Sequence, residues 1–325
     1  MPSAILTPEL FATLPPGFSR RRELGPLWWV SFAAADRLAS LPLAETRAAA
    51  YRATLVRNLA ALDRCAEILD AAEAEGLVLL PLKGALFAAL VYPDAGARPM
   101  ADLDLAVRPR ELPAAVACLE RLGFRRLYGP RARFSPRHGH DVAMTDGHVF
   151  VELHYRLMHE LGADADVEPL FARAIAVELF GKPRPVPSWD DHLWFTAVHA
   201  ATHAFGEPAA WPIDLALLLG RGANVSRAAA EARRRGVGAA FDVALDLAHA
   251  LLPGFVPAPI RRPGLAFRLR LLRLALGADP LARVPARIRS LVARAIVTER
   301  PAVALYEIAR KSELRLVELL EIRER

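Results

Sequence analysis

The spacing of apolar and polar residues along the chain predicts a helical start, a mixed middle and a helical end. Between Leu43 and Glu75, leucine and isoleucine recur every three or four residues, which is typical of an amphipathic helix. Gly76 follows where a C-cap is expected. Short apolar runs and Pro- and Gly-rich loops come next, and helical spacing returns from about Asp190.

The middle part predicts a small sheet. We expect strands at 77–81 and 102–107, helices at 84–91 and 110–123, and a hairpin formed by 140–146 and 148–157. Asp146 and Gly147 supply the turn signal of that hairpin. This order predicts a small mixed sheet with helices packed against it.

The rest of the chain predicts helices, at 190–206, 211–220, 226–236, 239–252, 265–276, 284–297 and 301–323. We therefore predict a helix-rich α+β protein in three parts. These are an N-terminal helical segment (1–75), a mixed αβ core (76–160) and a C-terminal helical region (161–325).

Composition adds one feature to this picture, a scarcity of lysine. The chain has 325 residues, 54% of them hydrophobic, and a net charge of +6 that comes almost entirely from arginine. Such a bias has two interpretations, the base composition of the genome or a basic surface for a phosphate-bearing partner. Because an ammonium is a compact point charge and a guanidinium a planar fork, the retained Lys83 is informative.

Cysteine usage and the N-terminus bear on the compartment. Cys65 and Cys118 lie in helical pattern without CxxC spacing, which fits a reducing, cytoplasmic environment. We expect no signal peptide, because the N-terminus lacks a basic start followed by an apolar stretch and a small-residue cleavage site. We expect no membrane partner, because no stretch reaches about 18 uncharged apolar residues. A nucleic-acid partner is not expected either, because the arginines are dispersed and lack interleaved aromatic residues.

Asp102 and Asp104 are the first candidates for chemistry. Residues two apart in a strand point to the same face, with Cα atoms about 6.5–7 Å apart. Two carboxylates at that separation repel each other unless a cation lies between them, and Mg²⁺ prefers such oxygen ligands. The alternative interpretation is a pair of solvated acids at the end of a strand.

Further residues extend this candidate site. Gly84 lies between a predicted buried strand and a helix, where a phosphate can approach backbone N–H groups, and Lys83 beside it adds positive charge. Arg98, four residues before Asp102, is within reach of a phosphate. Glu152 lies in a strand that otherwise reads as core, so its carboxylate needs a partner, either a shared metal or an arginine.

Four histidines are further candidates for a functional role. His154 shares a strand face with Glu152, where it either contacts substrate, orients a carboxylate or simply packs. His140 opens the preceding strand and is a further site candidate. His199 and His203 have a spacing that can bind Zn²⁺ but no evident third ligand, so two histidines on a helix face are the other interpretation.

These residues carry a resemblance. The stretch "LKGALFAALVYPDAGARPMADLDLAV", followed by "LERLGF" and "VFVELHYRL", resembles the uncharacterised nucleotidyltransferase family of the DNA polymerase β-type superfamily. The similarity covers about residues 76–157, and a weaker one covers 198–219. In the weaker stretch Asp214 is either a first-turn acid or a residue that contacts the catalytic half.

The resemblance implies Mg²⁺-dependent transfer of a nucleoside monophosphate from a nucleoside triphosphate, with ATP expected, to an unknown hydroxyl group. The acceptor would be a small molecule, a protein or a peptide. Asp102, Asp104 and Glu152 would bind two Mg²⁺ ions and act as the catalytic residues, with Glu152 helping to polarise the attacking hydroxyl. Residues implied to contact the nucleotide are Lys83, Gly84, Arg98, His154 and His140.

Two departures from the superfamily pattern keep other functions open. Ala85 stands where the superfamily has Gly or Ser, and the spacing from Gly84 to Asp102 is longer than usual. The alternatives are a catalytically degenerate nucleotide-binding protein with a regulatory role, or a partner-binding protein of a toxin–antitoxin pair or of peptide natural-product assembly.

Overall fold

The computed structural model describes residues 6–14, 21–127, 140–158, 165–203, 205, 210–258, 264 and 296–298. Its helices are α1 (Pro8–Thr13), η2 (Arg22–Leu24), α3 (Gly25–Ala34), η3 (Leu38–Ser40), α4 (Ala44–Ala74), α5 (Lys83–Leu86), η4 (Phe87–Val91), α6 (Leu112–Arg121), α8 (Glu168–Ala172), α9 (Trp189–Thr202), α10 (Trp211–Gly220), α11 (Val225–Arg234) and α12 (Gly238–Leu251). Its strands are β1 (Leu80–Pro81), β2 (Leu103–Ala106), β3 (Arg125–Arg126), β4 (Asp141–Thr145), β5 (Phe150–His154), β6 (Ile175–Leu179) and β7 (Lys182–Val186). The predicted helix-rich α+β fold is confirmed.

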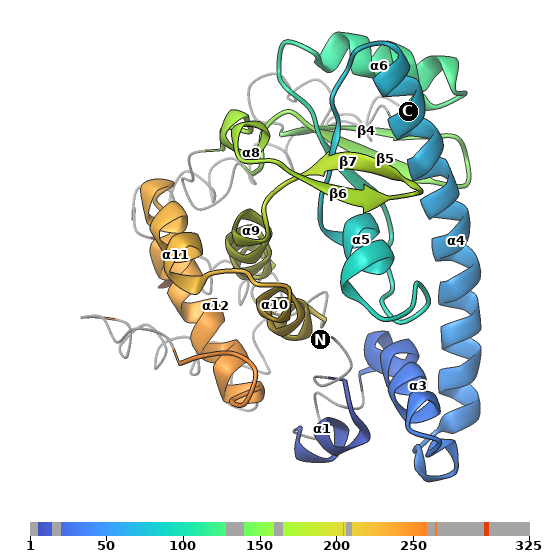
Figure 1. Ribbon diagram of the computed structural model, residues 1–325, viewed down its shortest axis with the longest axis vertical. Coiled ribbons are helices and arrows are strands. Elements are labelled where there is room, and N and C mark those ends of the chain that lie inside the picture. Colours follow the sequence, from blue (N-terminus) through green and yellow to red (C-terminus); the bar gives the residue numbers. More distant parts are fainter. Residues whose placement is uncertain are drawn as a thin grey trace, which may run out of the picture.

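Helix α4 forms one flank of the molecule, and the N-terminal helix α3 packs against its first half (Figure 1). The predicted end of α4 is confirmed, because Gly76 adopts a left-handed φ of +72° just after the last helical turn. Trp28 on α3 is fully buried in the resulting core. The predicted helices at 265–276 and 301–323, and nearly all of the one at 284–297, lie outside the described residues.

A five-stranded mixed sheet forms the centre of the αβ core, with the strand order β1-β2-β5-β4-β3. Strands β2 and β5 are parallel, whereas the other neighbours pair antiparallel. The predicted hairpin is present, and the Asp146 carboxylate holds its turn by accepting the backbone N–H groups of His148 and Val149 at 2.9 and 2.8 Å. The side chains of Leu103, Leu105, Val151 and Leu153 are fully buried. One face of this strand pair therefore belongs to the core.

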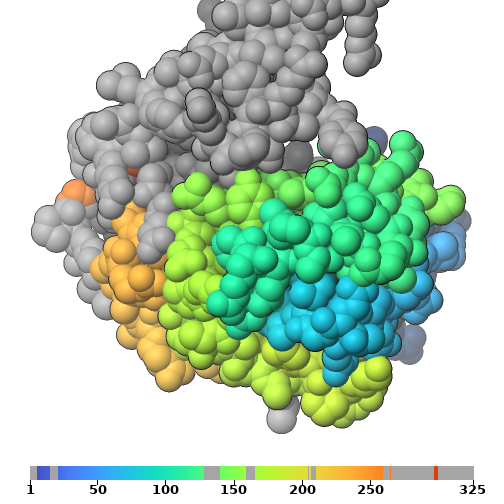
Figure 2. All heavy atoms as spheres, turned by 90° about the horizontal axis from the view of Figure 1, so that it is seen from above, coloured from blue at the N-terminus to red at the C-terminus, as the bar shows by residue number. Residues whose placement is uncertain are grey.

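The helices α9 to α12 gather on the side of the molecule opposite α4 (Figure 1). Helix α9 starts at Ser188, whose hydroxyl caps the Asp191 N–H at 3.2 Å, and packs against α10, α11 and α12. Figure 2 shows the gold to orange atoms of the α11–α12 part of the chain beside yellow-green atoms on the face seen from above. No helix within the described residues combines the length and apolarity needed to cross a bilayer.

A second hairpin, β6–β7, was not predicted from the sequence. Its two strands pair antiparallel from Ile175 with Val186 to Leu179 with Lys182. Strand β7 lies near β1, and Arg184 and Lys182 both reach Asp70 on α4. This hairpin therefore joins the third part of the chain to the first two. The three-part division itself remains a prediction.

Candidate active site

Strand register brings the candidate acids together. In the parallel pair, Asp104 on β2 lies beside Glu152 on β5, and Ala106 lies beside His154. Side chains alternate along a strand, so Asp104, Glu152 and His154 share the face opposite the buried leucines and valines. Asp104 and Glu152, far apart in the sequence, are therefore brought side by side by the pairing of β2 with β5.

Lys83 reaches the same face from the loop at the start of α5. The Leu82 N–H donates to the Asp104 carbonyl at 2.8 Å, which fixes the next residue beside β2. Lys83 Nζ lies 3.3 Å from Asp104 Oδ2 and 5.0 Å from the centre of the Phe195 ring on α9. Its backbone has a φ of +33°, an unfavourable value for a residue with a side chain. Such strain concentrates at functional sites.

His154 bridges the two acids. Its Nε2 lies 2.7 Å from Asp104 Oδ1 and 3.4 Å from Glu152 Oε2, and the side chain is almost fully buried. Asp104 thus uses both carboxylate oxygens, one toward Lys83 and one toward His154. The other ring nitrogen, Nδ1, has no hydrogen-bond partner among the described residues.

The pKa values of these groups are pulled apart. Burial alone would raise the pKa of Asp104, but Lys83 and His154 outweigh it and hold that pKa well below its usual range. Burial, with the charges of Asp104 and Glu152, raises the pKa of Asp102 to about 6. Burial opposes the charging of His154, yet its hydrogen bonds to the two acids raise its pKa to about 9. The hydrogen bond from His154 lowers the pKa of Glu152.

Three carboxylates therefore face one ammonium and one imidazolium. The surplus of negative charge makes ionisation of the Asp102 carboxyl unfavourable, as its raised pKa shows. Ligand atoms of Asp104, Glu152 and His154 lie within 4.8 Å of one another, close enough to hold one metal ion. Hard carboxylate oxygens with a charge surplus fit a divalent cation such as Mg²⁺. We refer to Lys83, Asp102, Asp104, Glu152 and His154 as the acid site.

Arg98 lies in the loop that leads into β2 and pairs with an acid on α10. Its Nε and Nη2 donate to the two carboxylate oxygens of Asp214 on α10, both at 2.9 Å, and Tyr92 donates to the same carboxylate at 2.7 Å. All three side chains are buried. Asp214 does lie in the first turn of α10, and it contacts the catalytic half through this pair. The contact of Arg98 with a phosphate remains a prediction.

Gly84 allows a close approach of the backbone. A Cβ atom there would come within 3.3 Å of the Met100 Cβ and 3.7 Å of both Arg98 Nη1 and the Asp102 carbonyl oxygen. Any side chain would push against the loop that leads into β2. The glycine thus fixes the spacing between the start of α5 and the acids, and its contact with a nucleotide remains a prediction.

His140 lies beside the acid site. Its ring centre lies 5.4 Å from that of His154, and its Nδ1 lies 3.4 Å from Asp141 Oδ1. Its carbonyl accepts the N–H groups of Tyr155 and Arg156. The residue therefore anchors the start of β4 to the end of β5.

Helix α9 brings residues that the sequence did not assign to the site. Phe195 packs on Lys83, and His192 lies edge-on to Phe87 with ring centres 5.5 Å apart. Burial and the charge of Lys83 lower the pKa of His199, while the charge of Asp104 raises it. The helical spacing of these residues on α9 was visible in the sequence. No pattern in the sequence indicated that this face of α9 is turned toward β2.

Comparison with protein-family models gives one match. Residues 18–253 match the model of a family described as uncharacterised nucleotidyltransferase. That range contains every member of the acid site. No curated protein matches the sequence. The assignment therefore rests on the family model.

Two solved structures are similar in backbone arrangement. One is a solution structure of the antibiotic-resistance factor ANT(2'')-Ia, at 18% identity and a TM-score of 0.40, covering 55% of this chain and 91% of that chain. The other is a crystal structure of ANT(2'')-Ia in complex with adenylyl-2''-tobramycin, at 18% identity and a TM-score of 0.41, covering 53% and 97%.

Proposed function

Because the chain belongs to the family of uncharacterised nucleotidyltransferases and is therefore an enzyme of nucleotidyl transfer, we propose that the acid site is its catalytic centre. The proposed reaction moves a nucleoside monophosphate from a nucleoside triphosphate, with ATP expected, to a hydroxyl group of an acceptor. Pyrophosphate is released. The acceptor is a small molecule, a protein or a peptide.

One observation carries this proposal: the register that sets Asp104 beside Glu152, with Lys83 and His154 closing the same face. Asp102 adds the third carboxylate at the start of β2. A buried cluster of acids that exceeds its counter-charges is destabilising unless a cation joins it. This surplus supports a function as a metal site better than a purely structural one.

We assign roles to the chain's own residues as follows. Asp102, Asp104 and Glu152 would hold two Mg²⁺ ions, which would supply Lewis-acid stabilisation of the negative charge on the phosphate oxygens. His154 orients Asp104 and Glu152 through Nε2. Lys83 offers its ammonium to a phosphate oxygen, for which a compact point charge is suited.

Ala85 favours a second candidate, a protein that binds nucleotide without turnover. The residue is buried beside Gly84 and has no hydroxyl for a phosphate. The two candidates differ in one result: both predict metal-dependent nucleotide binding, and only the first predicts pyrophosphate release.

The test is isothermal titration of ATP, CTP, GTP and UTP with Mg²⁺ into the wild-type protein and into the double variant Asp102→Asn, Asp104→Asn. We expect the wild type to bind one nucleotide in a metal-dependent manner and the double variant to lose that binding. Asp63→Asn is the matched control, because it removes a carboxylate from the exposed face of α4.

Equal nucleotide binding by the wild type and the double variant would contradict the assignment of the acid site. A pyrophosphate-release assay on the same proteins then separates the two candidate functions. Binding without any pyrophosphate, under conditions in which an acceptor hydroxyl is abundant, would favour the non-catalytic candidate.

A further inference from the structure

The nucleotidyl transfer proposed above needs a group that takes the proton of the acceptor hydroxyl. The imidazole of His154 is a poor choice, because its Nε2 is already engaged with Asp104 and Glu152. Glu152 and the two aspartates are assigned to the metal ions. The remaining titratable side chains near the acid site come from other elements.

One stripe of α9 faces the acid site. His192, Phe195 and His199 stand three and four residues apart, so they share one side of the helix. His192 lies edge-on to Phe87 at the start of η4, and Phe195 lies under the Lys83 ammonium. The His199 ring centre is 6.2 Å from that of Phe195. The stripe therefore runs along the αβ core and ends at His199.

His199 differs from His154 and His140 in what its nitrogens do, and from the fully buried His192 in its exposure. His154 is bonded to two acids, and His140 lies beside Asp141. The His199 side chain makes ring contacts with Phe195 and His203, and within the described residues no hydrogen bond is recorded for its nitrogens. It is also partly exposed. Its nitrogens are therefore open to a ligand.

Burial and neighbouring positive charges disfavour the protonated form of this imidazole. Burial is the first cause that holds the pKa of His199 well below its ordinary value. The charges of Lys83 on α5, His154 on β5 and His203 on α9 act in the same direction, while Asp104 on β2 opposes them. A neutral imidazole has a lone pair, as a proton acceptor requires.

We propose that His199 is the general base that takes the proton from the attacking acceptor hydroxyl. The acceptor O–H bond breaks and its proton goes to a ring nitrogen of His199. The freed oxygen pair forms the bond to the α-phosphorus, and the bond from that phosphorus to the pyrophosphate oxygen breaks with its electron pair. His199 later returns the proton to water. This inference rests on the proposed function.

The experiment measures pyrophosphate release from the Mg²⁺–nucleotide complex with glycerol as a surrogate hydroxyl acceptor. We expect His199→Ala to slow release by about 10²–10⁴-fold, the usual contribution of a general base. The affinity for the nucleotide, measured separately by titration calorimetry, should stay within about twofold. Imidazole added to His199→Ala should restore part of the rate, whereas His199→Gln should stay slow.

The matched control is His148→Ala, which removes an exposed imidazole from the far end of the β4–β5 hairpin and should release pyrophosphate at the wild-type rate. A His199→Ala rate within about threefold of wild type would overturn the proposal. So would a loss of nucleotide affinity as large as the loss of rate, or a slow variant that imidazole does not accelerate. Failure of the proposed function has a different signature, equal nucleotide binding by wild type and the acid-site double variant.

Discussion

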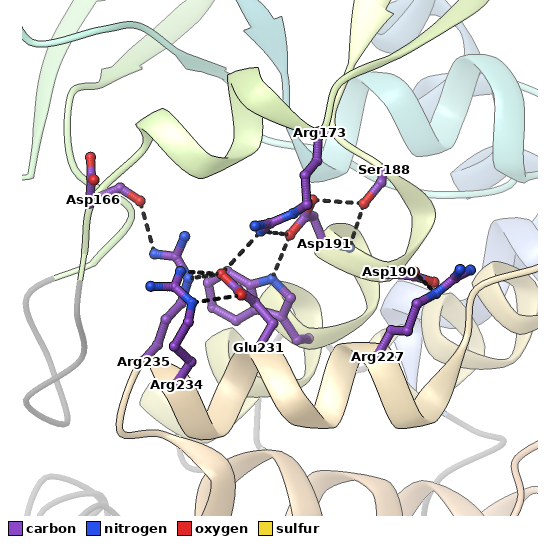
Figure 3. Close-up of polar contacts among 10 residues, drawn as sticks. Asp166, Arg173, Ser188, Asp190, Asp191, Arg227, Glu231, Arg234 and Arg235 are labelled. Atoms are coloured by element: carbon purple, nitrogen blue, oxygen red, sulfur yellow. Dashed lines mark hydrogen bonds and ion pairs between the residues drawn. The ribbon is translucent and has the colours of Figure 1, made fainter.

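Two clusters of charge in this protein use opposite chemistry. We call the second one the arginine anchor; it joins α8, α9 and α11 and consists of Arg173, Asp191, Glu231, Arg234 and Arg235 (Figure 3). Arg173 Nη2 lies 2.6 Å from Asp191 Oδ1 and 3.0 Å from Glu231 Oε1. Arg235 Nε donates to Glu231 at 2.6 Å and Nη1 donates to the Asp166 carbonyl at 2.8 Å. Here the positive groups exceed the acids.

The acid site shows the reverse balance and uses different cations. Its positive groups are a lysine and a histidine, and carboxylates are in excess. Guanidinium groups hold fixed, forked geometry and never lose their charge, which suits a scaffold. An ammonium and an imidazole are held by fewer bonds, which suits a site where ligands are exchanged. The type of cation and the sign of the surplus charge therefore distinguish the two clusters better than burial does.

Removing Glu231 should have the largest effect on stability. The Arg235 side chain is 0% exposed, so Glu231→Ala leaves a buried guanidinium without its carboxylate partner. We expect the free energy of unfolding to fall by about 3–5 kcal/mol, measured by urea denaturation. Glu67→Ala, which breaks an exposed pair with Arg64, should cost less than about 1 kcal/mol. Equal losses in the two variants would show that the anchor does not stabilise the fold.

Neutralising Asp102 should have the opposite sign. Its raised pKa means that its ionisation opposes folding at neutral pH. We therefore expect Asp102→Asn to raise the free energy of unfolding by about 2 kcal/mol at pH 7 without metal, after allowance for partial exposure. The same variant should lose metal-dependent nucleotide binding. A destabilised Asp102→Asn would mean that this carboxylate is needed by the scaffold.

The two clusters should also respond oppositely to acid. Burial opposes ionisation of Glu231, but Arg234 and Arg235 lower its pKa from 4.5 to about 2, so its stabilisation is present above pH 4.5 and is lost as pH falls toward 2. The pKa of Asp102 is raised from 3.8 to about 6, so the folded state gains stability as pH falls from 6 to 4.

Urea denaturation between pH 3 and pH 7 can separate these contributions. The difference between wild type and Glu231→Gln should shrink below pH 4.5, whereas wild type should gain on Asp102→Asn below pH 6. Each change should exceed about 1 kcal/mol across its window. Two flat difference curves would contradict the assigned directions of both pKa shifts.

The sequence predicted the acid-bearing strands because their signals are local. Alternation around Asp102 and Asp104 and the Asp146–Gly147 turn each lie within a few residues. Those signals predicted β2 and the β4–β5 hairpin, and the strand face shared by Glu152 and His154 followed from them. The parallel pairing that sets Glu152 beside Asp104 is a long-range contact, which no local pattern specifies.

The features that the sequence did not predict, the β6–β7 hairpin and the Arg98–Asp214 pair, also have physical explanations. The β6–β7 hairpin contains Pro183 and Pro185, which are depleted in strands, and its turn places Phe180 at a φ of +55° before Gly181 at +74°. A phenylalanine is a poor signal for such a turn. The partner of Arg98, Asp214, is more than a hundred residues away, so no local pattern could pair the two, although Asp214 was a candidate for contact with the catalytic half.

Exchanging lysine for arginine should have the smallest effect and sharpens the comparison most directly. Lys83→Arg keeps the charge but replaces a point charge between Asp104 and Phe195 with a larger planar group. We expect nucleotide affinity to fall about fivefold, ~1 kcal/mol, by titration calorimetry. Lys182→Arg is the matched control, since that lysine is 53% exposed and pairs with Asp70 on α4. If both variants bind nucleotide as the wild type does, the kind of cation at the acid site does not matter, and the contrast with the arginine anchor reduces to the sign of the surplus charge.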